Sequence, residues 1–439
     1  MHVNKLYKMS KISIILLLIL LLSPTIYYQK TYTTLSFQIP ALRGIFAPSC
    51  FWLNKYYNTY QELYSFHEDF PIFYFEKVKY FIPTDITYIK QILELTPSIF
   101  KQQQYKYNFF KQFIGYNVDT VTGCPWKSQR VLNEKVLIVN YLRKYAYYYN
   151  KTIQTLLEPS IPQNYTEFRH LSKQMISKII FNKDKIPNKV SKFLVHPDTI
   201  FSTTYQKNKL TEETLRFIRK FLLNELHFSK PLSLLSLCKD THLTKDELIE
   251  KIPPWIFPIA SLIHTTIPQI LTYVIHNNKM DILRKELQFL DLTDTDAICK
   301  TPFLRQCIFE TMRLNCPSSA TVRVLSKPFT YNKDKTFYKY SQFILLNKNI
   351  LHNKQCFEQP QQFIPERWTE ETEMLYSSLI FNQGPHHCPW KYIAIFIMSS
   401  FIAHYLNQAN ILTGENTIVT HDSVYHMKKY GFTLRSRRK

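Results

Sequence analysis

One long uncharged stretch constrains the fold of this 439-residue chain more than any other feature. It runs from Pro253 to Asn277, PPWIFPIASLIHTTIPQILTYVIHN, without a single Asp, Glu, Lys or Arg. It is far too long for a strand and is apolar all round, so it predicts either a buried central helix or a membrane span. Pro258, Pro268 and the polar run from His264 to Thr266 favour a buried helix with a local distortion.

The remaining pattern is mostly helical. Helical signals dominate from about residue 125, and TKDELIEKI has a threonine cap followed by an acidic first turn. WKYIAIFIMSSFIAHYL predicts another buried helix near the C-terminus. Aromatic-rich segments at about 70–85 and alternating segments after residue 320, with a turn at Asn332-Lys333-Asp334, predict small sheets. We therefore expect a mainly α fold with small β-sheets.

Charge and cysteine usage narrow the class of protein. The net charge is +22, but the lysines are spread along the chain and no nucleic-acid motif occurs, so we expect no nucleic-acid partner. Spread lysines fit a solvated surface, an anionic membrane face or an acidic protein partner. The eight cysteines form no CxxC pair, which indicates a reducing compartment and not a disulfide framework.

The N-terminus predicts a membrane anchor. ISIILLLILLLSPTIYY, from Ile12 to Tyr28, carries no charge and is at the short end for a bilayer-spanning helix. A cleaved signal peptide is the alternative, but no small-x-small cleavage site follows. We expect an uncleaved N-terminal transmembrane helix within residues 1–30 and one folded domain over residues 31–439. Three lysines precede the helix and would keep the N-terminus cytosolic: Lys5, Lys8 and Lys11.

The strongest chemical signal is FNQGPHHCPW, from Phe381 to Trp390. The chain has only six glycines, and one of them, Gly384, lies four residues before Cys388. A lone cysteine is commonly a small buried hydrophobe. Here Pro389 suits the start of a helix, and a helix N-terminus favours a thiolate, as a metal or haem iron requires. A catalytic cysteine with a histidine base is a second interpretation, and a zinc site from His386, His387 and Cys388 is weaker because a second ligand cluster is lacking.

Two other groups of charged residues stand out. Glu310 and Arg313 are three residues apart in IFETMRL, and Arg367 lies in FIPERW. Alone, the first two would be an ordinary exposed ion pair. In these apolar settings a charge needs a partner, so the three side chains predict a buried network beneath the cysteine loop.

The remaining candidates are arginine and tryptophan side chains that could bind a carboxylate group of a ligand. Trp126 and Arg130 are four residues apart in PWKSQR and would share a helix face, although a surface helix start is the simpler interpretation. Arg323, in a predicted strand after the Glu310 helix, offers another guanidinium. Arginine binds carboxylates through two parallel hydrogen bonds.

In these motifs the chain resembles the cytochrome P-450 family of haem-thiolate monooxygenases. The family's haem loop, Phe-x-x-Gly-x-Arg/His-x-Cys-x-Gly, matches Phe381, Gly384, His386 and Cys388 in register. The family motif Glu-x-x-Arg matches Glu310 and Arg313, and the motif Pro-Glu-Arg matches Pro365 to Arg367. The motif Trp-x-x-x-Arg matches Trp126 and Arg130. These motifs occur in family order along the chain. The resemblance covers nearly the whole chain and implies the cytochrome P-450 fold.

The resemblance also implies a cofactor and roles for individual residues. Cys388 would be the axial ligand of haem iron. Four residues would neutralise the haem propionates: Trp126, Arg130, Arg323 and His386. His264 and Thr265 match the acid–threonine or His–threonine pair of the family's central helix and would deliver protons to bound oxygen. A threonine bonded back into its own helix is the plainer alternative. Because Pro268 lacks an N–H and clashes with the carbonyl of residue 264, we expect the helix to loosen at His264.

Partners and substrate follow from the same resemblance. Electrons would come from an NADPH-dependent cytochrome P-450 reductase or a similar donor with an acidic surface. The protein would lie on membrane lipid, at the endoplasmic reticulum with its catalytic domain facing the cytosol, although the N-terminal lysines argue against that orientation. The His–Thr pair resembles sterol 14-alpha-demethylases and GPHHC resembles sterol C22-desaturases. We therefore expect a lipophilic small-molecule substrate of the sterol class, with fatty acids and xenobiotics as alternatives.

Two departures from the family pattern favour a competing interpretation. Trp390 stands where the family has a glycine after the cysteine, and Leu262 replaces the small residue usual in the oxygen groove. Both are consistent with a diverged, membrane-tethered haem-binding protein with little or no turnover.

Overall fold

The computed structural model describes the greater part of the chain in segments. These are residues 28–29, 32–33, 35–37, 72–75, 78–102, 123–137, 139–162, 165–195, 212–238, 243–317, 321–331, 335–413, 426–427 and 432–433. The chain forms two compact units: Met1–Gln103 with Ser319–Ile350, and Gln104–Ser318 with Leu351–Lys439. Nearly all of the anchor predicted within residues 1–30 lies outside the described residues, as does its boundary with the predicted domain over 31–439.

The first unit is built on a six-stranded sheet in the order β3-β4-β5-β10-β7-β6. The strands are β3 (Leu35–Phe37), β4 (Ile72–Phe75), β5 (Val78–Phe81), β6 (Phe100–Gln102), β7 (Thr321–Leu325) and β10 (Gln342–Leu345). β4 and β5 pair antiparallel, which confirms the strand pair predicted at 70–85. Edge-to-face rings fill the interior, with Phe343 lying 5.4 Å from Phe100 and 5.0 Å from Phe337 between ring centroids.

The described residues of this unit also form the helix α4 and two small strand pairs. α4 (Ile86–Glu94) starts at Asp85, whose carboxylate accepts the N–H of Thr87 as an N-cap. The short strands are β1 (Tyr28–Gln29) with β2 (Tyr32–Thr33), and β8 (Phe329–Tyr331) with β9 (Lys335–Phe337). The turn predicted at residues 332–334 falls between β8 and β9, outside the described residues.

The second unit is helical. Its helices are α6 (Gly123–Leu137), α7 (Val139–Leu157), α8 (Tyr165–Phe181), α9 (Asn188–Val195), α11 (Glu212–His227), α12 (Lys245–Ile249), α13 (Ile252–Ser261), α14 (Ile267–His276), α15 (Met280–Leu287), α16 (Thr295–Cys299), α17 (Pro302–Leu314), α19 (Glu370–Phe381) and α20 (Lys391–Thr413). α18 (Asn347–Leu351) spans the boundary between the units, and β11 (His426–Met427) pairs with β12 (Phe432–Thr433). The predicted mainly α fold with small sheets is thus confirmed.

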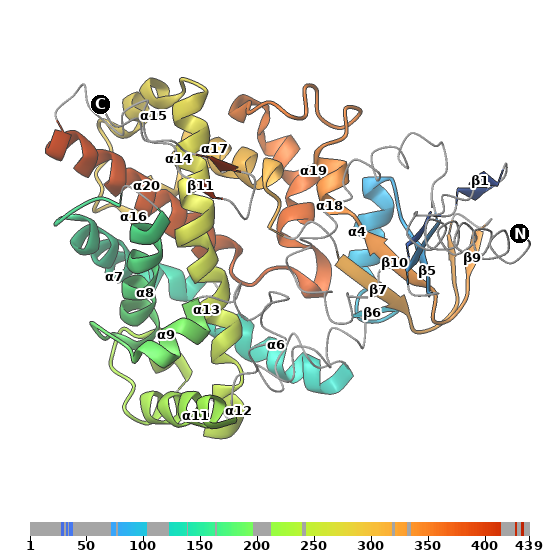
Figure 1. Cartoon of the computed structure of the whole chain (residues 1–439), viewed down its shortest axis with the longest axis horizontal. Helices are drawn as coiled ribbons and strands as arrows, with labels where there is room; N and C mark the ends of the chain where they lie inside the picture. The colour runs from blue at the N-terminus through green and yellow to red at the C-terminus, as the bar shows by residue number, and fades with distance from the viewer. Residues whose placement is uncertain are drawn as a thin grey trace, which may run out of the picture. The chain divides into compact units, whose positions relative to one another are not determined.

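The uncharged stretch forms the central column of this unit. α12, α13 and α14 follow one another along a single axis, with α11 and α12 at one end and α15 at the other (Figure 1). The predicted threonine cap is confirmed as a capping box, in which Thr244 and Glu247 exchange hydrogen bonds at the start of α12. By length and composition the helical run from Lys245 to His276 could cross a membrane, but 83% of its apolar window is buried within the protein. This burial supports the prediction of a central core helix.

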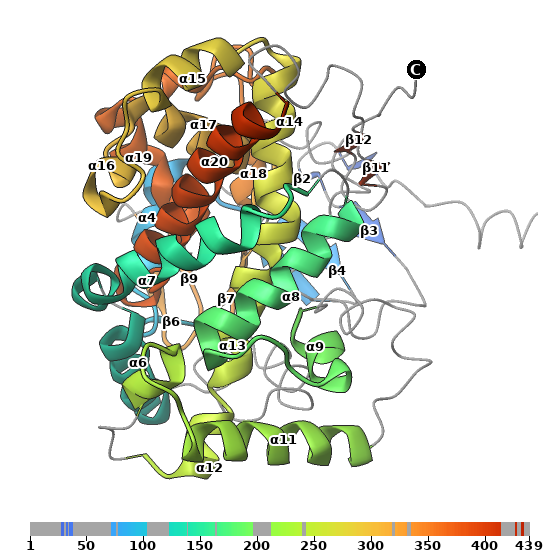
Figure 2. The same ribbon diagram turned by 90° about the vertical axis from the view of Figure 1, so that its left-hand side faces the viewer.

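α20 is a second long, buried helix of this unit. It lies beside α7, and α7 in turn lies beside α8 (Figure 2). A buried polar cluster joins α20 to α7: Asn150 Oδ1 accepts hydrogen bonds from Ser400 Oγ at 2.6 Å and from His404 Nε2 at 2.8 Å. Asn150 Nδ2 donates to the carbonyl of Leu292, so the cluster also fixes the segment before α16. Burial, with a smaller effect of the Lys151 charge, lowers the pKa of His404 to about 4.

His404 should make the protein less stable in mild acid. Its pKa is depressed in the folded state relative to the ordinary value of about 6.5, so between these pH values the unfolded chain binds the extra proton. Its contribution to stability is complete above about pH 6.5 and is lost as the pH falls towards 4, by about 3 kcal/mol at most. Urea denaturation of the natural protein and of His404→Gln, at pH 7.5 and pH 5, measures this contribution. We expect the natural protein to lose more stability than the variant, and equal losses would contradict the prediction.

Candidate functional site

The loop that carries Cys388 is held in a tight, fixed shape. Asn382 and Gly384 have left-handed backbones, with φ of +58° and +65°, and Gly384–His386 form a short 3₁₀ turn. Glycine enters this conformation without a steric penalty, so Gly384 suits the turn. The N–H of Cys388 donates back to the carbonyl of Phe381 at 2.6 Å, which closes the loop.

Cys388 lies where the loop enters α20. Pro389 and Trp390 form a turn, and α20 begins at Lys391, two residues later than Pro389. The N–H of Lys391 donates to the carbonyl of Cys388 at 3.3 Å. The thiol is half-buried, so the loop presents a sulfur at the N-terminal end of a long helix, where partial positive charge favours a thiolate.

Two residues of α6 meet this loop. The indole of Trp126 stacks on the imidazole of His386, with centroids 4.1 Å apart and planes 8° from parallel. Arg130 Nη2 lies 3.1 Å from Nε2 of His387, and Arg130 Nε donates to Glu134 at 2.7 Å. The structure therefore brings Trp126, Arg130 and His386 together at the cysteine loop. Their role towards propionates stays a prediction.

His387 is the site residue for which the sequence predicted no role beyond a weak zinc alternative. The sequence shows two consecutive histidines, and Trp126 and Arg130 spaced four apart, but nothing in it indicates that the two pairs meet. No group of three or more His, Cys, Asp or Glu side chains is placed to hold a metal ion within the described part of the chain. The zinc alternative for His386, His387 and Cys388 therefore has no structural support.

Arg323 lies in the first unit, on β7. Its Nε donates to Thr96 Oγ1 at 3.3 Å and its Nη1 to the carbonyl of Val322 at 3.0 Å, and the side chain is buried. These contacts fix the guanidinium within its own unit. Its participation in the cysteine site stays a prediction.

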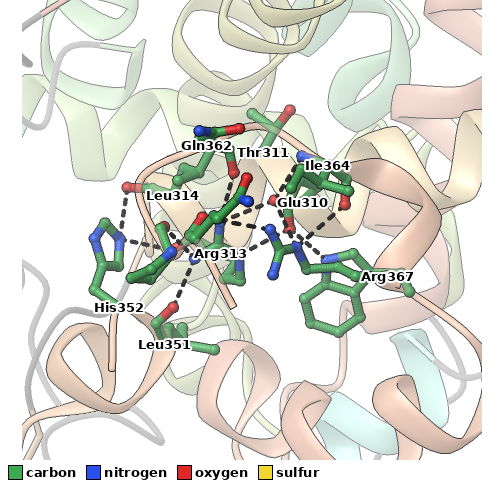
Figure 3. Close-up of polar contacts among 12 residues, drawn as sticks. Glu310, Thr311, Arg313, Leu314, Leu351, His352, Gln362, Ile364 and Arg367 are labelled. Carbon is green, nitrogen blue, oxygen red and sulfur yellow. Dashed lines mark hydrogen bonds and ion pairs between the residues drawn. The ribbon is translucent and has the colours of Figure 1, made fainter. Parts of the chain in front are cut away.

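The predicted charge network is confirmed. Glu310 and Arg313 are fully buried on α17 and form a bidentate pair, with both N–O distances 2.8 Å. Arg367 Nε approaches Glu310 Oε1 at 3.3 Å (Figure 3). Carbonyl groups of Leu351 and Pro360 accept from Arg313 Nη1 at 2.7 Å each. Each charged group in the network therefore has a partner, with two guanidiniums sharing the one carboxylate of Glu310.

Aromatic rings connect this network to the cysteine loop. Trp368 Nε1 donates to Glu310 Oε2 at 2.8 Å, and its ring lies 5.0 Å from that of Phe309 between centroids. Phe309 also contacts Phe381, the first residue of the loop motif, at 6.0 Å in an edge-to-face arrangement. Side-chain contacts through Trp368 and Phe309 thus connect the buried charge network to the cysteine loop.

The central column is distorted where the sequence predicts it. Residues Leu262–Thr266 form a π-helical turn, and the N–H of Ile267 donates to the carbonyl of Leu262. Pro268, which lacks an N–H, lies two residues after this turn, so the widened turn has the expected cause. His264 and Thr265 are both buried on this turn, and α20 packs against it. Thr265 Oγ1 is buried without a hydrogen-bond partner among the described residues.

These features together fit a large flat cofactor with an anionic edge. A sulfur ligand is presented on a rigid loop, a buried arginine lies next to the loop, and a buried threonine hydroxyl in a widened helical turn still has hydrogen-bonding capacity. The site residues therefore fit the haem-thiolate site that the resemblance to the cytochrome P-450 family implies.

The comparisons with known proteins show which family the chain is similar to. Residues 260–424 match the family model described as cytochrome P450. Human cytochrome P450 4Z1 is 22% identical, and the alignment covers 87% of this chain and 88% of that protein. Over these residues the chain is similar to cytochrome P450 monooxygenases, and this similarity implies a haem-thiolate cofactor.

Other relatives match only over part of their length. A probable cytochrome P450 28d2 of Drosophila melanogaster is 29% identical over 32% of this chain and 30% of that protein. The C-22 sterol desaturase of Saccharomyces cerevisiae is 33% identical over 25% of this chain and 20% of its own. A retinoic acid-bound cyanobacterial CYP120A1 structure has a TM-score of 0.68 at 16% identity, covering 81% of this chain and 88% of that one, which shows the shared fold. The relatives are mixed, and no sterol-specific assignment follows from them.

Proposed function

We propose that this protein is a haem-thiolate monooxygenase that oxidises a lipophilic substrate with molecular oxygen. One observation carries the proposal: Cys388 is presented by a closed loop at the start of α20, and α20 packs against the π turn that holds Thr265. This arrangement supports the proposal, because the loop of Cys388 leads into a helix that contacts the turn of Thr265. When bound, the haem supplies the oxygen activation, and electron donation by the thiolate favours O–O cleavage.

The residues that would hold the haem divide into an iron ligand and a propionate-binding set. Cys388 would ligate the iron, and the left-handed Gly384 with the Phe381–Cys388 hydrogen bond would keep the sulfur oriented. Four residues would bind the propionates: Arg130, Trp126, His386 and Arg323. Arg130 is well suited because it is buried and its carboxylate partner, Glu134, is more exposed than it is.

His264 and Thr265 would manage protons on the other side of the site. The Thr265 hydroxyl, which has no hydrogen-bond partner among the described residues, would hold a proton at Oγ1 and would regain it from neighbouring polar groups or water. The widened turn supports this role because a π segment leaves backbone carbonyls without their regular helical partners. The alternative, a Thr265 hydroxyl bonded back into its own helix, finds no support among the described residues.

Partners and location follow as parts of the same proposal. The family needs an electron-transfer partner, and the net charge of +22 favours a donor with an acidic surface, such as an NADPH-dependent reductase. The uncharged segment from Ile12 to Tyr28 supports a single-pass anchor at the endoplasmic reticulum. A sterol substrate is supported by the His264–Thr265 pair and by the partial match to a fungal sterol C-22 desaturase.

The second candidate is a haem-binding protein without turnover. Trp390 follows Cys388 by two residues, is only 5% exposed, and its indole nitrogen has no hydrogen-bond partner among the described residues. A bulky ring so close to the ligand crowds the position where the family has a glycine. Leu262, also buried, adds bulk to the π turn.

Spectra and turnover separate the two candidates. The purified full chain is reduced, exposed to carbon monoxide, and scanned for the thiolate-specific absorption band. It is then supplied with a reductase, NADPH and a sterol mixture. The thiolate band together with product formation supports the monooxygenase. The thiolate band supports the binding protein if fatty acid, sterol and xenobiotic panels give neither oxygen-dependent NADPH consumption nor product. Purified protein that takes up no haem would overturn both.

A further inference from the structure

α6 is attached to the cysteine loop by two matched contacts. Trp126 and Arg130 are four residues apart on α6, so they lie on the same helix face. His386 and His387 are consecutive in the loop, and each contacts one of them. The first contact is a ring stack. The second is a hydrogen bond, which has a direction and therefore fixes the two groups more closely.

The chemistry of Arg130 decides how His387 is protonated. A guanidinium has only donors, so His387 Nε2, 3.1 Å from Arg130 Nη2, must be the acceptor. In a neutral imidazole the other nitrogen then carries the proton. His387 Nδ1 lies 3.0 Å from the carbonyl of Gly384, which can only accept. Both observed distances are satisfied by one tautomer, with Nδ1–H donating to Gly384 and Nε2 accepting from Arg130.

The imidazole therefore bridges two parts of the site. On one side it holds the carbonyl of Gly384, the residue whose left-handed backbone shapes the loop. On the other it holds Arg130, whose Nε is already fixed by Glu134. With both partners the guanidinium is fixed along two of its edges. Further along α6, Asn133 accepts from Trp255 of α13 at 3.0 Å, so the helix is also anchored away from the loop.

We propose that His387 is a positioning residue that couples the shape of the cysteine loop to the placement of Arg130. The inference rests on the proposed function, because it assigns the purpose of the coupling to a bound haem. The ring keeps the sulfur of Cys388 and the guanidinium of Arg130 in a constant relation, so that one rigid ligand engages both. His387 itself lies outside the motif residues that match the family's haem loop.

Two substitutions separate the two hydrogen bonds. In His387→Asn the side-chain amide nitrogen occupies about the position of Nδ1 and can donate to Gly384, but it cannot reach Arg130. In His387→Gln the longer side chain places its oxygen near the position of Nε2, so it can accept from Arg130 while the Gly384 carbonyl loses its donor. A matched control is His227→Asn, because His227 is an exposed histidine on α11 that contacts Lys245 and is remote in the chain from the site.

The first measurement is the rate at which haem leaves the protein. The rate is monitored by the transfer of the haem to apomyoglobin. His387→Asn loses the hydrogen bond to the charged Arg130, which should accelerate haem loss about tenfold. His387→Gln loses the hydrogen bond to the neutral Gly384 carbonyl, which should accelerate haem loss about threefold. The reduced, carbon monoxide-bound spectrum should keep its thiolate band in both variants. His227→Asn should match the natural protein.

The second measurement needs no haem. Hydrogen exchange in the haem-free protein should accelerate in α6 for His387→Asn, and at the loop amides of His387 and Cys388 for His387→Gln. In an Arg130→Gln background, His387→Asn should add nothing to the exchange of α6, because the partner is already absent.

Haem loss and exchange equal to those of the natural protein in both His387 variants would overturn the coupling while leaving the function intact. The coupling is also contradicted if the two variants accelerate exchange in the same segments, since the ring would then have a general structural role. A natural protein without the thiolate band would overturn the proposed function instead, and the exchange measurements would still decide the coupling.

Discussion

Cys388→Ser is expected to abolish the thiolate-specific absorption band of the reduced, carbon monoxide-bound protein completely. A serine hydroxyl is not ionised near neutral pH and is a poor ligand for haem iron, so the axial bond would be lost or replaced by another group. The fold should survive, because the side chain is only half-buried and the loop is closed by the backbone N–H of residue 388, which serine retains. Absorption spectra and far-ultraviolet circular dichroism of the same preparation check both expectations.

Cys299→Ser is the matched control for this experiment. Cys299 is also a half-buried free cysteine, on α16, and burial raises the pKa of its thiol, with the Asp296 charge adding to the effect. A thiol kept protonated in this way is a poor ligand, so the control should retain the full band. An unchanged spectrum in Cys388→Ser, or loss of the band in Cys299→Ser, would contradict the assignment of Cys388 as ligand.

Features with a local cause could be predicted from the sequence. The π turn at Leu262–Thr266 follows from the missing N–H of Pro268, and the capping box at Thr244 follows from residue types at fixed spacing. The Glu310–Arg313 pair was predictable for a related reason: a charge in an apolar helix must find a partner, and the nearest opposite charge is one turn away. In each case the decisive atoms lie within a few residues of each other in the chain.

Features that depend on long-range packing could not be predicted in the same way. Arg130 and His387 are 257 residues apart, and no local rule states that they meet. Trp368, next to Arg367 in the sequence, donates to Glu310, but a tryptophan after a charged residue has no fixed partner. Arg323 likewise donates to Thr96 and to the carbonyl of Val322, contacts that the sequence did not indicate, and its role at the site stays a prediction. Residue identity sets what a group can bond, and the packing of distant helices sets what it meets.

Arg313→Ala should have the largest effect on stability of any single substitution in the buried network. It would leave the fully buried carboxylate of Glu310 without its bidentate partner and would remove the donors to the carbonyls of Leu351 and Pro360. Breaking a buried ion pair by removing one member costs about 3–5 kcal/mol, because the remaining charge is uncompensated. That is a large part of the stability of a typical protein, about 5–15 kcal/mol, so we expect low yield or a much lower urea midpoint.

The control and an intermediate variant make the magnitude interpretable. Arg219 pairs with Asp246 at 2.8 Å on the surface, with side chains 46% and 67% exposed, so Arg219→Ala should cost less than about 1 kcal/mol. Arg313→Lys keeps the charge but not the planar fork that serves Glu310 and three backbone carbonyls together, so it should fall between the two. Equal urea midpoints for Arg313→Ala and Arg219→Ala would mean that Trp368, Arg367 and the Ile364 N–H satisfy Glu310 without Arg313. We expect the urea midpoint to be lowest for Arg313→Ala, higher for Arg313→Lys and highest for the natural protein, with Arg219→Ala close to the natural protein. This order would show that Arg313 is the group that stabilises the buried carboxylate of Glu310.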